Sequence, residues 1–339
     1  MEKIFENNQT IFLAGASGMV GSAIKRALLK MRSNNKKVKF NLLTPTRKEL
    51  DLLSSYSVQK WFASYKPTIV ILAAAKVGGI VANSDYPVDF LLENIKIQTN
   101  VIESAFKQNA KRFIFLGSSC IYPKFTTQPI KEESLLDNKL EKTNESYAIA
   151  KITGLKLCEA LRSQYNFDAI SLMPTNLYGP GDNYDLNNSH VIPALIKKFC
   201  DAKKNNINFV NCWGNGSPKR EFMHVDDLAE ACIFALEKFN PNENISFKDK
   251  EGDILNYLNV GTGIDISIYD LAYKIAEIID FKGKINWDLE KPNGTPLKRL
   301  DITKLSNLGW RHSIDLNKGL KETIDLYQNE NNLTSTYKK

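Results

Sequence analysis

The sequence predicts an α/β protein with a doubly wound parallel β-sheet and a smaller mixed α/β domain. Three observations support this fold class: runs of continuously apolar residues, their alternation with amphipathic helical segments, and a glycine-rich turn after the first run. Continuous apolar runs are typical of strands that helices bury on both faces. Alternation of strand and helix implies right-handed crossovers, which build a doubly wound sheet.

The first half of the chain supplies the elements of this sheet in order. We expect strands at Thr10–Ala16, Val38–Thr44, Thr68–Ala75, Arg112–Ser119 and Ala169–Asn176. Between them, 3.6-residue periodicity predicts helices at Val20–Met31, Ser57–Tyr65, Phe90–Gln108 and Tyr147–Gln164.

The pattern changes after Tyr178, where residues 179–189 are rich in turn formers. Later helices are expected at Val191–Lys204, Val225–Phe239, Ile268–Ile279 and Leu316–Gln328, with short strands at Phe209–Trp213 and Tyr257–Val260. We therefore expect a first domain at residues 1–178, to which residues 221–262 return. A second, substrate-binding domain would take residues 179–220 and 263–330, and residues 331–339 would form a polar tail.

Composition excludes several classes of protein. No apolar run reaches the length of about 18 residues that a transmembrane helix needs, and the first ten residues lack a signal-peptide core. The five cysteines show no paired spacing and there are three histidines, so neither a disulfide framework nor a metal site is expected. The net charge of +7 is spread along the chain, which argues against a nucleic-acid partner. We expect a cytoplasmic protein.

A glycine fingerprint follows the first predicted strand. Gly15, Gly18 and Gly21 are spaced as G-x-x-G-x-x-G and open the first predicted helix. Such glycines permit a tight turn and a close approach of the backbone to a pyrophosphate, whose charge the helix N-terminus meets. The strand–turn–helix context therefore predicts a Rossmann dinucleotide site, with the intervening turn residues as further contacts: Ala16, Ser17, Met19 and Val20.

The end of the second predicted strand favours NADP(H) over NAD(H). An NAD-binding protein places a carboxylate there to bind the ribose 2′-hydroxyl. This strand ends in Thr-Pro-Thr-Arg-Lys, and the first carboxylate is Glu49. Arg47 is the cation that we expect to contact a 2′-phosphate.

Tyr147 and Lys151 lie four residues apart, which places both side chains on one face of a helix. A neighbouring ammonium is expected to lower the pKa of the phenol towards values useful for proton transfer. Ser118 and Ser119 end the predicted strand Arg112–Ser119, where active sites of open α/β sheets lie. With the glycine fingerprint, this set resembles the extended short-chain dehydrogenase/reductase family.

Four further blocks sharpen the resemblance: AAAKVGGIVAN from Ala73, GSSCIYPK from Gly117, PTNLYGP from Pro174 and NSHVIP from Asn188. They are similar to the corresponding blocks of the GDP-L-fucose synthase family, over nearly the whole chain. The resemblance implies epimerisation of GDP-4-keto-6-deoxy-D-mannose at C3 and C5, followed by NADPH-dependent reduction at C4. It also implies that Cys120 and His190 are the acid and base of the epimerisation, without saying which is which.

The same resemblance implies the binding residues. Besides the glycine turn and Arg47, the cofactor contacts would be Leu116, Gly117, Ser118, Ser119, Lys151, Pro174, Thr175, Asn176, Leu177 and His190. The GDP-sugar contacts would be Lys198, Trp213, Arg220 and Asn293. Two positions depart from the family pattern: Ala16 and Ser17 replace a frequent His-Arg pair, and Asn293 replaces a frequent aspartate that would contact guanine.

Alternative functions stay open on sequence alone. The chain could be a simple NADPH-dependent 4-keto reductase or a GDP-L-colitose-type synthase acting on a related nucleotide sugar. A non-catalytic NADP-sensing protein on the same fold is a different class, but it predicts loss of Tyr147 or Lys151, and both are present. Family resemblance also implies a homodimer.

Overall fold

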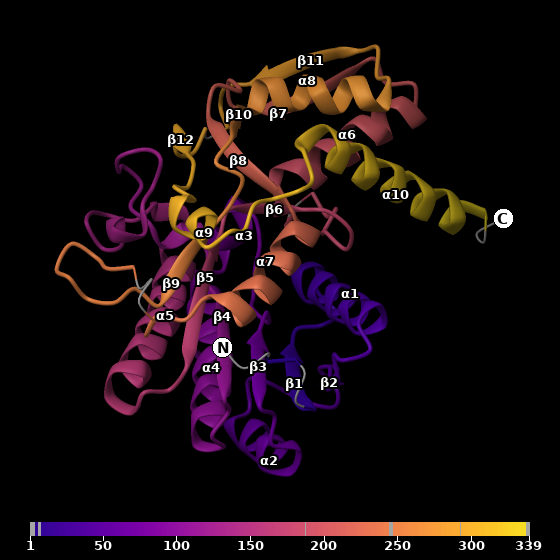
Figure 1. Cartoon of the computed structure of the whole chain (residues 1–339). Coiled ribbons are helices and arrows are strands. Elements are labelled where there is room, and N and C mark those ends of the chain that lie inside the picture. The colour runs from indigo at the N-terminus through magenta and orange to yellow at the C-terminus, as the bar shows by residue number, and fades with distance from the viewer. Residues whose placement is uncertain (1–3, 6–7, 187, 244–246, 292, 337–339) are drawn as a thin grey trace.

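The computed structural model describes residues 4–5, 8–186, 188–243, 247–291 and 293–336, with side chains up to residue 330. Its centre is a six-stranded parallel sheet with the strand order β2-β1-β3-β4-β5-β9 (Figure 1). These strands are β1 (Gln9–Ala14), β2 (Phe40–Leu43), β3 (Ile69–Leu72), β4 (Arg112–Leu116), β5 (Ala169–Pro174) and β9 (Tyr257–Val260). The order reverses beside β1, and ligands of open α/β sheets bind at such a switch point.

Helices cover both faces of this sheet, which confirms the predicted fold class. The residues of β1 show why: Ile11 and Leu13 pack with α1 and α7, whereas Phe12 packs with α2, α4 and α5. Both faces of the strand are therefore buried, as its continuous apolar sequence predicts. The helices are α1 (Met19–Asn34), α2 (Ser55–Tyr65), α4 (Pro87–Lys107), α5 (Glu145–Tyr165) and α7 (Val225–Lys238).

The remaining elements lie beyond the carboxyl ends of the central strands (Figure 1). They include β6 (Asn176–Tyr178), β8 (Lys219–His224), β10 (Asp265–Ser267) and β12 (Leu297–Lys298) in one sheet, and β7 (Phe209–Trp213) paired with β11 (Lys284–Asp288). Helices α6 (Val191–Lys204), α8 (Ile268–Ile279) and α10 (Leu316–Thr336) share a separate apolar cluster beside them. The short helices α3 (Ile80–Asp85) and α9 (Thr303–Asn307) complete the elements named in Figure 1.

The boundaries differ from those expected at a few points. The predicted strand Ala169–Asn176 ends at Pro174, and β6 is a separate strand that leaves the central sheet to pair with β8. The last helix runs to Thr336, so most of the expected polar tail is helical, and residues 337–339 lie outside the described residues. Strands β8, β10, β11 and β12 were not predicted from the sequence, because they lack continuous apolar runs, and β10 and β12 are only three and two residues long.

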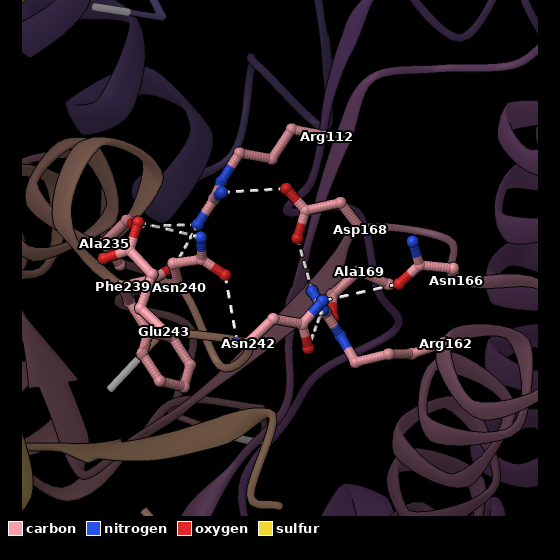
Figure 2. A network of polar contacts seen from close by, with 10 residues as sticks. All are labelled: Arg112, Arg162, Asn166, Asp168, Ala169, Ala235, Phe239, Asn240, Asn242 and Glu243. Atoms are coloured by element: carbon pink, nitrogen blue, oxygen red, sulfur yellow. Dashed lines mark hydrogen bonds and ion pairs between the residues drawn. The ribbon is translucent and has the colours of Figure 1, made fainter. Parts of the chain in front are cut away.

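The amino ends of β4 and β5 are joined by a polar network (Figure 2). Arg112 pairs with Asp168 at 2.8 Å and donates to the carbonyl oxygens of Ala235 and Phe239 at the end of α7. Asp168 also pairs with Arg162 of α5. The network therefore ties both helical layers to the sheet at the edge away from the carboxyl ends.

No helix in the described part of the chain is both long and apolar enough to cross a membrane. All five cysteines are free thiols.

Candidate active site

A cavity of about 450 Å³ opens at the carboxyl ends of the central strands. The segments after β1, β3, β4 and β5 form its floor, with Met19, Ala73, Gly117 and Pro174 among the lining residues. The elements beyond the sheet form its other walls through residues of α6, β7 and β8. This is where the topology of an open α/β sheet places a ligand.

The glycine turn at one edge of the cavity has the geometry that a pyrophosphate requires. Gly15 has a φ of +84°, and a Cβ on Gly21 would lie 2.0 Å from the Gly15 carbonyl oxygen. Side chains are therefore excluded at both positions. The helix α1 begins after Gly18 with no side-chain cap, so its first amide groups are free to meet an anion.

The end of β2 offers a cation where an NAD-binding site would offer a carboxylate. Arg47 is exposed, and none of the described residues forms an ion pair with it. The first carboxylate, Glu49, turns back to accept hydrogen bonds from the amide and hydroxyl of Thr46, at 2.7 and 2.9 Å. These residues fit an adenosine ribose that carries a phosphate.

Ser118 contacts both Cys120 and Tyr147, two of the other candidate catalytic residues. Its hydroxyl oxygen accepts a hydrogen bond from the backbone amide of Cys120 at 3.2 Å and caps the 3₁₀ turn Ser119–Ile121. The same side chain hydrogen-bonds to the Tyr147 hydroxyl. The turn after β4 therefore places the Ser118 hydroxyl, the Cys120 thiol and the Tyr147 phenol on one wall of the cavity.

Lys151 is buried, and its ammonium donates to the carbonyl oxygen of Leu116 at 2.8 Å. Burial lowers the pKa of Lys151 to about 8. The expected lowering of the Tyr147 pKa by this ammonium is not observed. Loss of hydration, and secondly the charge of Cys120, raise the pKa of Tyr147, and the hydrogen bond with Ser118 offsets them in part. The expectation was wrong because desolvation outweighs the attraction of a lysine that faces a carbonyl instead.

His190 stands directly before α6 and also lines the cavity. Much of its surface is open to the cavity, while the surrounding protein lowers its pKa. A backbone hydrogen bond from Gly79 to Asn188, 3.0 Å long, ties the preceding loop to the segment after β3. The imidazole therefore faces the cavity, where the surrounding protein disfavours its charged form.

Basic and aromatic side chains line the far end of the cavity. The Lys198 ammonium lies 5.6 Å from the ring centroid of Trp213 and donates to the Asn211 carbonyl oxygen at 2.9 Å. Arg220 comes from β8, and burial lowers its pKa without removing its charge. Asn293 also lines the cavity, but its Oδ1 accepts a hydrogen bond from the Asn215 amide at 2.9 Å.

Most of the residues expected from the sequence line this cavity. They are Met19, Val20, Leu116, Gly117, Ser118, Ser119, Cys120, Tyr147, Lys151, Pro174, Thr175, Asn176, Leu177, His190, Lys198, Trp213, Arg220 and Asn293. Gly15, Ala16, Ser17, Gly18, Gly21 and Arg47 lie at the glycine turn and the end of β2, outside the lining.

Among the lining residues that were not predicted, two contact the Cys120 sulfur. Lys298 of β12 and Asn144 each place a side-chain nitrogen 3.4 Å from the Cys120 sulfur. Asn144 lies three residues before Tyr147, a spacing from which its position near the catalytic face could have been expected. No local signal marks Lys298, because the pairing of β12 with β8 brings it 178 residues along the chain to Cys120.

Comparison with known proteins agrees with this geometry. Residues 11–247 match the model of the NAD dependent epimerase/dehydratase family. GDP-L-fucose synthase 1 of Arabidopsis thaliana is 49% identical over 95% of this chain and 94% of its own length. GDP-L-fucose synthase of Escherichia coli (strain K12) is 48% identical over 95% of this chain and 97% of its own.

A solved structure shows the same fold. The GDP-mannoheptose C4 reductase MlghC from Campylobacter jejuni, with NADP bound, superimposes with a TM-score of 0.83 at 35% identity, covering 95% of this chain and 98% of the other. With the glycine turn, the Ser118–Tyr147–Lys151 set and a family match over more than half its length, this chain belongs to the NAD dependent epimerase/dehydratase family.

Proposed function

We propose that the protein is an NADPH-dependent GDP-L-fucose synthase, which epimerises GDP-4-keto-6-deoxy-D-mannose at C3 and C5 and then reduces C4. One observation carries this proposal: a single cavity holds both the Ser118–Tyr147–Lys151 set and the second pair of proton-transfer groups, Cys120 and His190. The identity of 48–49% to GDP-L-fucose synthases over nearly the whole chain supports the same substrate.

The Cys120–His190 pair supplies what epimerisation needs. The 4-keto group makes the protons at C3 and C5 acidic, since the carbanion formed is an enolate. Inverting each centre requires one group to remove a proton and another to return one to the opposite face. A thiol and an imidazole on different elements, after β4 and before α6, are suited to these two tasks.

The other three residues serve reduction. Bound NADPH would supply the hydride that C4 accepts. Tyr147, whose raised pKa keeps it protonated, donates a proton to the C4 oxygen, and Ser118 hydrogen-bonds to the same oxygen. Lys151, fixed on the Leu116 carbonyl, holds the nicotinamide ribose close to this wall.

The remaining contacts select the ligands. Arg47 binds the 2′-phosphate, which gives a preference for NADP(H). Lys198 and Arg220 hold the diphosphate of the GDP-sugar, and Trp213 provides a flat surface for the base. Asn293 faces guanine with an amide that Asn215 already engages, so guanine contributes less to binding than it would with aspartate at this position.

Assembly and organisation complete the proposal. Residues 1–178 and 221–262 form the NADP-binding domain, and residues 179–220 and 263–330 form the substrate-binding domain. The protein acts as a cytoplasmic homodimer. The apolar side chains that α4 exposes, Val88 and Leu92 at 67% and 47%, support a self-association surface. Light scattering of the purified protein would measure the number of subunits.

A simple C4 reductase is the second candidate, favoured by the similarity to MlghC. Product analysis separates the candidates. Purified protein, NADPH and GDP-4-keto-6-deoxy-D-mannose are mixed, oxidation is followed at 340 nm, and the sugar is identified by NMR. GDP-L-fucose is expected from the wild type. Cys120→Ser and His190→Gln should give little of it.

If the wild type gave an unepimerised 4-hydroxy sugar, the protein would be a simple C4 reductase and the proposed synthase would be rejected. If competing keto-sugar nucleotides were consumed faster, the natural substrate would be a related one, as in a GDP-L-colitose-type synthase. No oxidation beside an active control enzyme would reject this substrate.

A further inference from the structure

The Cys120 sulfur is surrounded by donors rather than by apolar core. The Lys298 ammonium and the Asn144 amide nitrogen each lie 3.4 Å from Sγ. Asn144 approaches from the turn before α5, whereas Lys298 approaches from β12. A buried structural cysteine packs like a small hydrophobic residue, so two donors on one sulfur are unexpected for that role.

The charged groups that face this sulfur come from several elements. Arg220 of β8 interacts electrostatically with Cys120, and so does the phenol of Tyr147 in α5. Lys298 is the cation in direct contact with the sulfur. Among the described residues, the carboxylate in this region is Glu141, and Lys124 faces it at 3.6 Å.

A narrow recess of about 30 Å³ adjoins the main cavity at Cys120. Lys298, Asn144, Glu141 and Lys124 are among its lining residues. Cys120 therefore lines both spaces. Cations and amide donors placed this close to a sulfur stabilise a thiolate relative to a thiol.

We propose that Lys298, with Asn144, is a positioning residue that holds Cys120 as a thiolate and so makes Cys120 the base of the epimerisation. This inference rests on the proposed function and adds a residue to it. An ammonium this close to a sulfur stabilises its ionised form relative to the neutral thiol.

The proton-transfer step balances with this assignment. The thiolate takes the proton from C3 or C5, so an S–H bond forms and a C–H bond breaks. The electron pair of the C–H bond moves into the enolate, whose oxygen carries the negative charge. The imidazolium form of His190 then gives its proton to the opposite face of that carbon, and the neutral imidazole and the Cys120 thiol return to their starting forms by proton exchange with water. The charge of Cys120 also raises the pKa of Tyr147, which stays protonated for the later reduction.

Alkylation of Cys120 tests the assignment without any substrate. The wild type and Lys298→Met are treated with iodoacetamide, and the modification of each cysteine is followed by mass spectrometry. At pH 7, alkylation of Cys120 should slow about tenfold in the variant, the change that about 1.4 kcal/mol of lost stabilisation produces. The two rates should converge as the pH is raised further, because a higher pH ionises the thiol in both proteins.

Two variants and one internal control identify the cause. Lys298→Arg keeps the cation and should restore most of the rate. Lys124→Met removes the same charge from the same recess but loses a contact with Glu141, and should leave Cys120 unchanged. Cys200, which is partly exposed and accepts a hydrogen bond from Gln328, should react equally in all four proteins.

Deuterium exchange from heavy water into the keto sugar gives the second measurement, and it should fall with the alkylation rate. Equal Cys120 alkylation in the wild type and Lys298→Met at pH 7 would overturn the inference, whatever the activity. If alkylation slows as expected but even the wild type shows no exchange, the role of Lys298 stands and the epimerase proposal fails.

Discussion

A buried cation lies at each end of strand β4, and the two cations differ in their hydrogen-bond and ion-pair partners. At the amino end, Arg112 is neutralised by Asp168 and also donates to backbone carbonyl oxygens of α7 (Figure 2). At the carboxyl end, Lys151 donates to the Leu116 carbonyl oxygen, and no carboxylate in the described residues pairs with it. Burial lowers the pKa of both groups, and the Asp168 charge offsets this for Arg112.

This difference separates a structural end of the sheet from a reactive one. A buried ion pair whose charges compensate each other holds its elements together and offers no unpaired charge to a ligand. An uncompensated lysine costs stability until something binds to it, and the proposed ligand, a nicotinamide ribose, would do so. Strained or unpaired groups of this kind are typical of active sites.

The largest effect is expected from Tyr147→Phe at the reactive end. Loss of the proton donor should lower kcat for NADPH oxidation by about 10²- to 10⁴-fold, the usual contribution of general acid catalysis. Tyr257→Phe is the matched control. The Tyr257 hydroxyl, at the start of β9, donates to the buried Glu132 carbonyl oxygen. Steady-state kinetics of both variants measure kcat for NADPH oxidation. Equal activity of Tyr147→Phe and the wild type would remove Tyr147 from the chemistry.

At the structural end, Arg112→Met should lower the free energy of unfolding by about 3 kcal/mol. Breaking a buried pair typically costs about 3 to 5 kcal/mol, and Asp168 keeps Arg162 as a partner. Urea denaturation measures the loss, and kcat of the folded protein should stay within about twofold of the wild type. A large fall in kcat at normal stability would contradict the proposed division between the two ends.

Lys151→Met should change how stability depends on pH. The Lys151 pKa is about 8 when folded against an ordinary 10.5, so the unfolded chain binds more protons between these values. The free energy of unfolding therefore rises with pH across this window, by about 1.4 kcal/mol per unit or about 3 kcal/mol in total. Below pH 8 the destabilisation caused by burying the charged Lys151 is fully present.

Denaturation of the wild type and Lys151→Met at pH 8 and pH 10.5 isolates this contribution, because other titrations cancel in the difference. The stability of the wild type relative to the variant should increase with pH. A difference that is independent of pH would mean that Lys151 is not held at a lowered pKa.

The smallest effect is expected from Arg47→Ser, outside the cavity lining. Loss of the contact with the 2′-phosphate should lower kcat/KM for NADPH about tenfold and leave that for NADH nearly unchanged. Lys48→Ser, next to it and also exposed, is the matched control. Equal losses with both cofactors would mean that Arg47 contacts the adenine, which both cofactors share, or that it supports the fold.

Residues that share a local motif could be predicted from the sequence. The glycine turn, Tyr147 with Lys151, and Ser118 after β4 each combine a short spacing with a recognisable element, so their placement follows from helix and strand geometry. The central strands were predicted for a similar reason, since burial on both faces leaves a continuous apolar run.

Properties set by tertiary contacts could not be predicted. Lys298 reaches Cys120 through the pairing of β12 with β8, and two paired residues leave no periodic signal. The Tyr147 pKa was predicted in the wrong direction, because its hydration depends on packing and not on the spacing to Lys151. The contact of Asn293 with Asn215 likewise joins segments 78 residues apart.

Deuterium incorporation tests the proposed function most directly. The protein, NADPH and GDP-4-keto-6-deoxy-D-mannose react in heavy water, and the product is examined by NMR. We predict GDP-L-fucose with deuterium at C3 and C5, because Cys120 and His190 exchange the protons at both carbons before C4 is reduced. A reduced sugar without deuterium at C3 and C5 would contradict this prediction and leave a simple C4 reductase.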